Sequence, residues 1–273
     1  QEWNVLEYDL DLPLIDSALP VLYGAPSLES NSNELRLGVD IFGTFFFLLT
    51  NFEAVILKDR DEHDRFPAQA SIAYKANYLH RPLADEYLEL LWACMKYHWP
   101  AIHRKPTVEL THVTCDVDQV YSPYVRSWHH ASRELAGALI KRHSLSEFIG
   151  KLKNKVATQF KNYRYEPYNT FDWIMDVNES AGNKVTFFFQ AGHSVPSMDG
   201  DYDVTEVRIR SLLHRIHERG HEIGLHPSYG TYQNGMRLNT EADCLRSSLL
   251  EEQIFQQDIG SRQHYLRWDM FQT

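Results

Sequence analysis

The sequence contains few cysteines and no long apolar run. Its three cysteines, Cys94, Cys115 and Cys244, are widely spaced, and no pair has the C-x-x-C spacing of a zinc or redox site. We therefore expect reduced thiols in a reducing compartment. The longest apolar run, around Ile41–Leu49, is too short to span a bilayer, and no signal peptide opens the chain. These features predict a cytoplasmic protein without an integral membrane segment.

Positive charge is also scarce. The formal net charge is −10 at pH 7, and the chain has no Lys/Arg-rich run. A protein that follows the phosphates of a nucleic acid needs a basic face, so nucleic acid is not an expected partner. With 273 residues, 43% of them hydrophobic, the chain has enough apolar material for one large domain or two modest ones.

The first hundred residues differ in pattern from the rest. Apolar residues at helical spacing predict a helix over Leu83–Trp99, which ends at Pro100. A short basic linker, His103–Lys105, follows. We place a domain boundary there, with a smaller N-terminal α+β domain at residues 1–104 and a second domain at residues 105–273. No catalytic constellation is visible in the first domain.

From Thr107 the pattern changes to an alternation of strands and helices. The expected strands are Val108–Cys115, Lys184–Gln190 and Glu222–Leu225. The second is a continuous apolar run, as in a strand covered on both faces. The expected helices are Trp128–His143, one from a capping box of Asp203 and Glu206 to Gly220, and one capped by Thr240. This alternation predicts parallel strands in an α/β barrel or an open sheet.

Thr114–Asp118, at the C-terminal end of an expected strand, contains the first candidate site residues. Residues two apart in a strand share a face, so Asp116 and Asp118 are expected to project in the same direction. Neighbouring carboxylates repel each other unless a cation or a shared proton compensates. A cation suits one of them as a ligand and leaves the other beside it as a base. The alternative is a strand that ends in a solvated, Asp-rich turn.

Gly220–Gly230 contains two histidines five residues apart. This is not the H-E-x-x-H pattern of zinc peptidases, and Gly224 and Pro227 would break a helix. In a strand the five-residue offset sends His221 and His226 to opposite faces, so at most one of them ligates a metal. His226, at the strand's end, is the better candidate. His221 is expected to pack or form a hydrogen bond at the strand's start.

A third segment, Ser261–Arg267, contains two arginines, a histidine and a tyrosine directly after Gly260. By itself this pattern also fits a surface-exposed strand.

Together these segments resemble the polysaccharide deacetylases of the NodB type (carbohydrate esterase family four). Thr114–Asp118 has a Thr-x-Asp-x-Asp form of the family's first motif, and Val185–Gln190 is similar to its Thr-Phe-Phe strand. Gly220–Gly224 matches the Gly-His-Glu-Ile-Gly lead-in to the second motif, and Arg262–Tyr265 falls where the third is expected. The resemblance covers residues 107–273. The branch that it most resembles includes deacetylase-like proteins of surface-polysaccharide (O-antigen) biosynthesis.

The resemblance implies a distorted (β/α) barrel and a metal-dependent hydrolase that removes an N-acetyl or O-acetyl group from a sugar. Asp116 becomes the general base, and Arg262 becomes the residue that positions it. Asp118 and His226 become ligands of a divalent metal, expected to be zinc, which polarises the acetyl carbonyl. The expected contacts with the acetylated sugar are Tyr229 and Tyr265.

The sequence departs from the family pattern in two ways. Gly230 replaces the second histidine of the His-x-x-x-His motif and has no side chain to ligate a metal. His264 stands where the family has proline, and we expect it to be the third metal ligand. The chain also stops soon after the third motif, so we expect the barrel to be incomplete at its C-terminus.

Two other functions stay open. One is a hydrolase of the same fold that cleaves a different amide. The other is a catalytically idle sugar-binding or scaffold protein, left after loss of the second histidine. The motifs do not specify the sugar, its carrier or the oligomeric state.

Overall fold

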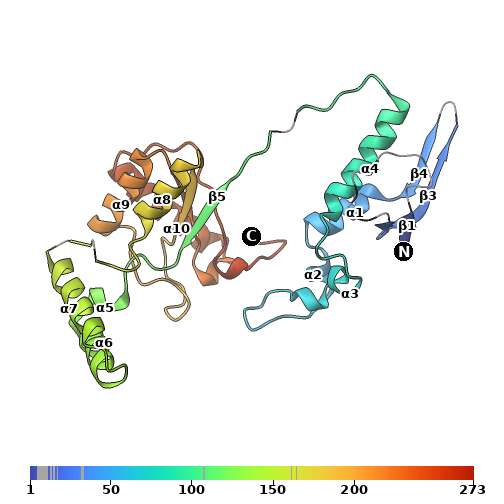
Figure 1. Cartoon of the computed structure of the whole chain (residues 1–273). Helices are drawn as coiled ribbons and strands as arrows, with labels where there is room; N and C mark the ends of the chain where they lie inside the picture. The colour runs from blue at the N-terminus through green and yellow to red at the C-terminus, as the bar shows by residue number, and fades with distance from the viewer. Residues whose placement is uncertain are drawn as a thin grey trace. The chain divides into compact units, whose positions relative to one another are not determined.

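We describe the protein from a computed structural model, over residues 1–4, 12, 14, 16, 18–31, 34–106, 108–160, 162–163 and 165–273. The chain forms two compact units, Gln1–Val108 and Glu109–Thr273 (Figure 1). We had placed the boundary four residues earlier, between residues 104 and 105. Thr107, the expected start of the strand–helix alternation, lies outside the described residues.

The described part of unit 1 consists of two small antiparallel sheets, the long helix α4 and several shorter helices, of which α1 packs against α4. The pairs are β1 (Glu2–Asn4) with β2 (Ala18–Pro20), and β3 (Gly24–Ser30) with β4 (Leu35–Val39). The helices are α1 (Ile41–Leu49), α2 (Glu53–Ile56), α3 (Ile72–Lys75) and α4 (Leu83–His98), with a 3-10 turn, η2, at Ala68–Ala70.

Helix α4 supplies much of the core of unit 1. One of its faces buries Leu83, Tyr87, Leu90 and Cys94. The Tyr87 hydroxyl donates to the Pro20 carbonyl at 2.8 Å, which ties α4 to β2. The expected helix over Leu83–Trp99 is confirmed, ending one residue early. No helix in the described ranges is both long enough and apolar enough to cross a membrane.

Unit 2 is organised around a parallel sheet in the order β5 (Val113–Val117), β6 (Val185–Phe189) and β7 (Glu222–Leu225). The register aligns Val117, Phe189 and Leu225, so the carboxyl ends of the three strands meet at one edge. The fold is mixed α/β. No sheet of the described residues closes into a barrel.

The two faces of this sheet differ. Alternate residues such as Cys115, Phe187 and Ile223 face a core built with α8 (Phe171–Ser180), α9 (Val207–Glu218) and α10 (Gly235–Glu251). The opposite face carries a row of Asp116, Phe188 and Gly224, aligned by the same register. Every residue of β6 is buried, as its unbroken apolar pattern predicted.

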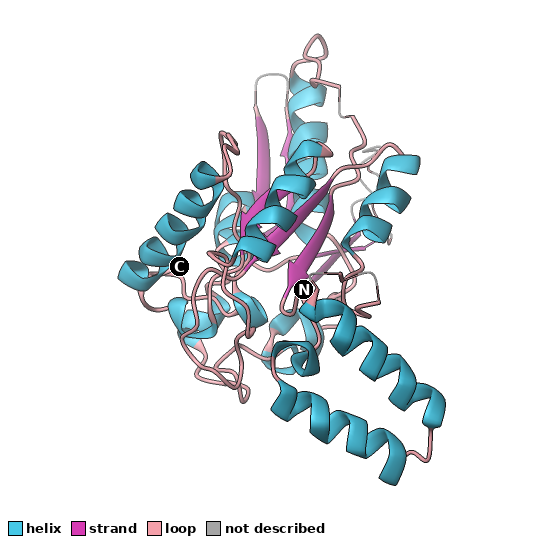
Figure 2. Ribbon diagram, turned by 90° about the vertical axis from the view of Figure 1, so that its left-hand side faces the viewer, coloured by secondary structure: helices cyan, strands magenta, loops and turns pink. Residues whose placement is uncertain are grey.

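A helical segment separates β5 from α8. It contains α5 (Pro123–Arg126), α6 (Trp128–Ile140) and α7 (Leu145–Gln159), of which the sequence analysis predicted only α6. Helices α6 and α7 run side by side as a hairpin (Figures 1 and 2). The segment begins where β5 ends, so it leaves the sheet at its carboxyl edge.

Two predicted elements of unit 2 have different bounds. The strand runs from Val113 to Val117 rather than from Val108 to Cys115, because only these residues pair with β6, and Val108 is 83% exposed. Helix α6 ends at Ile140 rather than at His143. The φ of His143 is +48°, a left-handed conformation that cannot continue a helix.

One predicted helix cap lies just before its helix, and the other is wrong. The Asp203 carboxylate accepts from the Thr205 N–H and Glu206 accepts from the Asp203 N–H at 3.4 Å, as in the predicted box, but α9 begins only at Val207. Asn234, not Thr240, caps α10 by accepting from the N–H of Arg237. The Thr240 hydroxyl lies inside the helix, where it donates to the Met236 carbonyl.

The outer edge of β7 is covered by side-chain and backbone groups from the chain that follows α10. The Gln256 side chain accepts from the Ile223 N–H at 3.0 Å and donates to the Ile223 carbonyl at 2.7 Å. Farther along, Leu225 forms an isolated parallel bridge with Ser261. These contacts satisfy backbone groups that an open sheet edge would leave unpaired.

We predict that Gln256→Ala destabilises the protein by about 1–3 kcal/mol, because both backbone groups of the buried Ile223 lose their partner. The exposed neighbour Gln257→Ala is the matched control and is expected to change stability by less than about 0.5 kcal/mol. Urea unfolding followed by circular dichroism measures both values. Equal values for the two variants would contradict the role of Gln256.

Candidate metal centre

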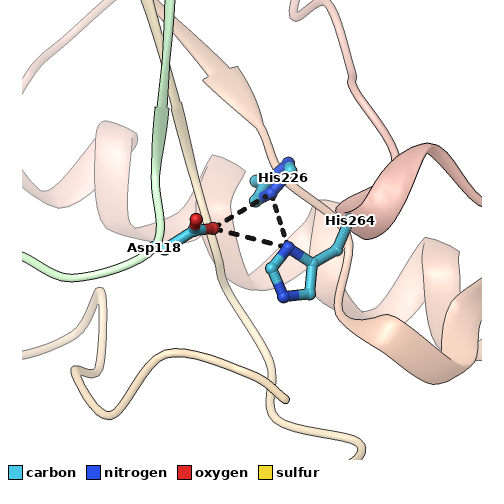
Figure 3. A group of neighbouring side chains, drawn as sticks. All are labelled: Asp118, His226 and His264. Carbon is cyan, nitrogen blue, oxygen red and sulfur yellow. Dashed lines mark hydrogen bonds and ion pairs between the residues drawn. The ribbon is translucent and has the colours of Figure 1, made fainter.

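Three side chains from distant parts of the chain meet at the carboxyl edge of the sheet. Asp118 follows β5, His226 follows β7, and His264 begins η4 (His264–Leu266). Their facing atoms are close: Asp118 Oδ1 lies 3.3 Å from His226 Nε2 and 3.4 Å from His264 Nδ1. The two histidine nitrogens are 2.8 Å apart (Figure 3). Both imidazoles are buried, whereas the Asp118 side chain is 59% exposed.

Each ring has an inner nitrogen, which faces the other two side chains of the centre, and an outer nitrogen, which faces a backbone carbonyl. His226 Nδ1 lies 2.6 Å from the Arg262 oxygen, and His264 Nε2 lies 2.8 Å from the Met198 oxygen. A carbonyl oxygen can only accept, so each outer nitrogen carries a proton and donates it. The inner nitrogens then direct their lone pairs at each other and at the Asp118 carboxylate. A cation between these three acceptors, either a shared proton or a metal ion, would relieve their mutual repulsion.

The geometry fits a tetrahedral metal ion such as zinc. Ligand bonds of about 2.0–2.2 Å place neighbouring tetrahedral ligand atoms about 3.3–3.6 Å apart. Both carboxylate–imidazole separations have this value, and the imidazole pair at 2.8 Å needs to open by about 0.5 Å. Two nitrogens and one oxygen also form a ligand set that zinc favours.

When the shared cation is a proton on His226 Nε2, the hydrogen bond that it donates holds the pKa of Asp118 below its usual value, against the effect of burial, and the nearby His264 lowers it further. Asp118 is therefore ready to act as an anionic ligand. Cys115 differs, because burial raises the pKa of its thiol and the charges of Asp116 and Asp118 raise it further. Cys115 faces the helical core and contributes no ligand.

The backbone near β7 brings His264 to the centre. The Arg262 N–H donates to the Leu225 carbonyl at 3.0 Å, and the His264 N–H donates to the Pro227 carbonyl at 3.3 Å. Directly after His264 the chain turns through Tyr265 and Leu266, whose φ values are 61° and 53°. Two consecutive non-glycine residues in the left-handed region are strained, as is common where a side chain is held for function.

The Met198 carbonyl, in the loop after β6, orients His264. The sequence analysis did not predict this contact. The Gln190 side chain accepts from the Gly200 N–H at 2.6 Å, and Tyr202 donates to the Val117 carbonyl at 2.6 Å. A Cβ on Gly200 would lie only 2.2 Å from the Asp118 carbonyl oxygen. Met198 acts through its backbone, which every residue type shares, so its role left no signal in the sequence.

Two buried carboxylates hold the loop after β7. Asp199 accepts from the N–H groups of Ser194, Val195 and Tyr229, and Glu241 accepts from the N–H and hydroxyl of Ser228. Burial raises the pKa of Glu241, and the bonds from Ser228 oppose that rise. Sequence reasoning missed both carboxylates, although Asp199 begins an Asp-Gly pair typical of a turn.

Gly230, which replaces the family's second histidine, packs closely against the loop after β6. Its N–H donates to the Ser194 hydroxyl at 2.6 Å, and a Cβ there would lie 3.1 Å from Ser194. The position therefore has little room for a side chain. His264 is the histidine that the fold places beside His226.

Asp116 and Arg262 form an ion pair next to the centre. Arg262 Nη1 lies 3.1 Å from Asp116 Oδ1, and its guanidinium lies 5.1 Å from the Phe188 ring centroid. Phe188 occupies the space above Gly224, where a Cβ would come within 2.4 Å of the ring. Arg262 thus orients two groups, Asp116 through its side chain and His226 through its carbonyl.

The two tyrosines expected to contact substrate form an aromatic pair beside His264. The rings of Tyr229 and Tyr265 pack edge to face at 5.3 Å, and Tyr265 packs against His264 at 4.7 Å. Both tyrosines are partly exposed. Their position allows contact with a ligand bound at the centre.

His221 lies at the opposite end of β7. Its Nδ1 accepts from the Val185 N–H at 3.1 Å, and its Nε2 lies 3.1 Å from Glu179 Oε1. It bonds at the strand's start, as predicted, and its ring packs against Phe187 of the core.

We predict that His226→Ala abolishes zinc binding, whereas His221→Ala retains zinc but lowers stability by about 1–3 kcal/mol, since the buried Val185 N–H loses its acceptor. Zinc content by mass spectrometry and urea unfolding measure the two effects. An equal loss of zinc in both variants would refute the assignment.

We also predict that His264→Ala weakens zinc binding by more than about a hundredfold, because even partners outside the ligand set contribute ten- to hundredfold. His129→Ala, which removes an exposed imidazole from α6, is expected to leave the affinity unchanged. A competitive titration with a zinc-binding dye measures both. Unchanged affinity in His264→Ala would reduce this histidine to a packing role.

Comparisons with known proteins relate only the first part of the chain to a family. A family model described as "Family of unknown function (DUF7033)" matches residues 2–100. This range lies within unit 1 and contains no residue of the candidate metal centre. No curated protein matches the chain, and no solved structure matches it. Unit 2 is thus interpreted from its own residues, with the resemblance to polysaccharide deacetylases as a prediction.

Proposed function

We propose that the protein is a metal-dependent hydrolase that removes an acetyl group from a sugar. The main support for the proposal is that Asp118, His226 and His264 converge. Both histidines donate their outer N–H to a backbone carbonyl, which leaves the inner nitrogen of each ring to bind a metal. Three protein ligands leave a fourth position open, as in hydrolytic zinc sites. The order of the motifs along the chain supports the NodB type of deacetylase, with unit 2 as part of a distorted (β/α) barrel.

Asp116 is the proposed general base. It lies two residues from Asp118, beyond the ligand set, and its ion pair with Arg262 orients its carboxylate. Zinc bound by the three ligands would lower the pKa of water and polarise the acetyl carbonyl. Asp116 would then accept a proton from the attacking water and pass it to the departing nitrogen or oxygen as the acetyl carbon–nitrogen or carbon–oxygen bond breaks, which releases acetate and the amine or hydroxyl of the sugar.

The tyrosine pair is the proposed contact for the sugar. Tyr229 and Tyr265 lie beside His264 and offer partly exposed rings. A pyranose has an apolar face of C–H groups that packs against such rings, while its hydroxyls stay solvated. This arrangement favours a sugar substrate over a peptide amide.

We predict that the zinc-loaded chain releases acetate from an acetylated oligosaccharide, that chelation abolishes the activity and that added zinc restores it. Asp116→Asn is expected to lower kcat by about 10²–10⁴-fold with zinc content unchanged, because it removes the base and not a ligand. Asp243→Asn, an exposed carboxylate on α10, is the matched control.

Acetate release is measured with N-acetylated chito-oligosaccharides, O-acetylated xylo-oligosaccharides and acetylated nucleotide sugars. Sugar binding by the zinc-loaded chain without acetate release from any of them would favour the idle sugar-binding protein. Full activity in Asp116→Asn would remove Asp116 from the mechanism.

A further inference from the structure

The helical segment between β5 and α8 lines an open hollow of about 1010 Å³. It contains none of the residues of the candidate metal centre. Its lining residues are Ser122, Pro123, Tyr124, His130, Arg133, Glu134, Glu147, Gly150, Lys151, Lys153, Tyr165, Pro167 and Tyr168. Aromatic and charged side chains predominate, which is typical of a binding site for a polar ring-shaped ligand.

A buried polar network fixes the base of this hollow. The Glu166 carboxylate accepts from the N–H and hydroxyl of Ser122 and from the N–H of Tyr168. Asn154 donates to Glu166 at 3.1 Å and to the Tyr124 hydroxyl at 2.7 Å. Glu166 and Asn154 are 4% and 1% exposed. Such a network adds little stability over apolar packing, but it fixes the positions of three lining residues.

The lining of the hollow has one more cation than anions, with Arg133, Lys151 and Lys153 against Glu134 and Glu147. Glu134 and Glu147 both pair with Lys151, at 2.5 and 3.0 Å, and with Arg142. Within the described residues, Arg133 and Lys153 form no ion pair with a carboxylate. Both are exposed on the surface of the hairpin. An anionic group in the hollow would neutralise them.

Two partly exposed tyrosines line the hollow together with these cations. Tyr165 is 45% exposed and Tyr168 is 46% exposed. Lys153 Nζ lies 4.2 Å from the Tyr165 ring centroid. A sugar ring that stacks on Tyr165 would therefore bring its acidic substituent within reach of Lys153.

We propose that this hollow binds an acidic carbohydrate segment, with its sugar rings on Tyr165 and Tyr168 and its carboxylate or sulfate groups on Arg133 and Lys153. The inference rests on the proposed function, because it takes the ligand to be the part of the same sugar substrate that lies away from the acetyl group. Ser122 in the hollow lies four residues after Asp118, so their Cα atoms are at most about 14 Å apart. An oligosaccharide of a few rings spans that distance.

The test is calorimetric titration of the full chain, freed of metal with a chelator, so that no deacetylation intervenes. The probes are an oligogalacturonate hexamer, a heparin hexasaccharide and neutral maltohexaose. We expect saturable binding of at least one acidic probe, more than about tenfold tighter than that of maltohexaose, since the two unpaired cations are the main source of selectivity.

The variants locate the binding. Arg133→Gln with Lys153→Gln is expected to weaken acidic-probe binding by about fivefold or more, because each exposed ion pair contributes a few-fold. Tyr165→Ala is expected to weaken it too. Lys141→Gln, an exposed lysine at the end of α6, is the matched control. Circular dichroism verifies that each variant is folded.

The inference is overturned if neither acidic probe binds saturably at millimolar concentrations, or if the double variant binds as the parent does. Tighter binding of hexathymidylate than of both acidic sugars would also overturn it, in favour of a nucleic-acid ligand. If the acidic probes bind but the zinc-loaded chain releases no acetate, the result would count against the proposed deacetylase activity. The assignment of the hollow as a binding site for acidic sugars would still stand.

Discussion

The imidazole rings of His226 and His264 each donate their outer N–H to a backbone carbonyl, and the chemistry of the centre depends on that pair of hydrogen bonds. Because the outer nitrogens are committed, the inner ones can act only as acceptors unless one takes up a further proton. The Asp118 carboxylate adds a third acceptor. The protein thus holds close together three groups that repel one another, and a cation relieves the repulsion.

Holding those groups in place requires both loops at the carboxyl edge of the sheet. The loop after β6 presents the Met198 carbonyl to His264. Asp199 and Glu241 link this loop, the chain after His226 and helix α10 through bonds to backbone N–H groups. A buried carboxylate is costly unless donors surround it, and here backbone amides provide them. The same bonds that compensate these carboxylates therefore make the ligand geometry rigid.

The candidate metal centre and the proposed sugar-binding hollow both begin at the carboxyl edge of the parallel sheet. Asp118 directly follows β5, and Ser122, the first residue that lines the hollow, comes four residues later. In α/β folds the carboxyl ends of parallel strands collect catalytic groups, because the loops that follow them converge there. A centre that cleaves a small group and a neighbouring surface that holds the rest of the sugar would divide the work of catalysis between them.

The sequence alone determined the features that depend on local pattern. The apolar run of β6, the helix over Leu83–His98 and the opposed directions of His221 and His226 follow from side-chain periodicity, which is a property of the backbone. Where the local sequence allowed two alternatives for a helix cap or a strand boundary, tertiary packing determined which one formed. Asn234 and Thr240 are both suitable caps, and β5 could begin at Val108 until its pairing with β6 is known.

The tertiary structure decided the partners of the centre. His264 and Met198 are 66 residues apart, and the hydrogen bond between them uses a carbonyl that no residue type marks. Gly230 has little room for a ligand side chain because Ser194, from another loop, lies against it. The sequence could identify the residue types able to ligate a metal. Their arrangement depended on the long-range packing of backbone groups, which are the same in every residue and therefore leave no pattern to read.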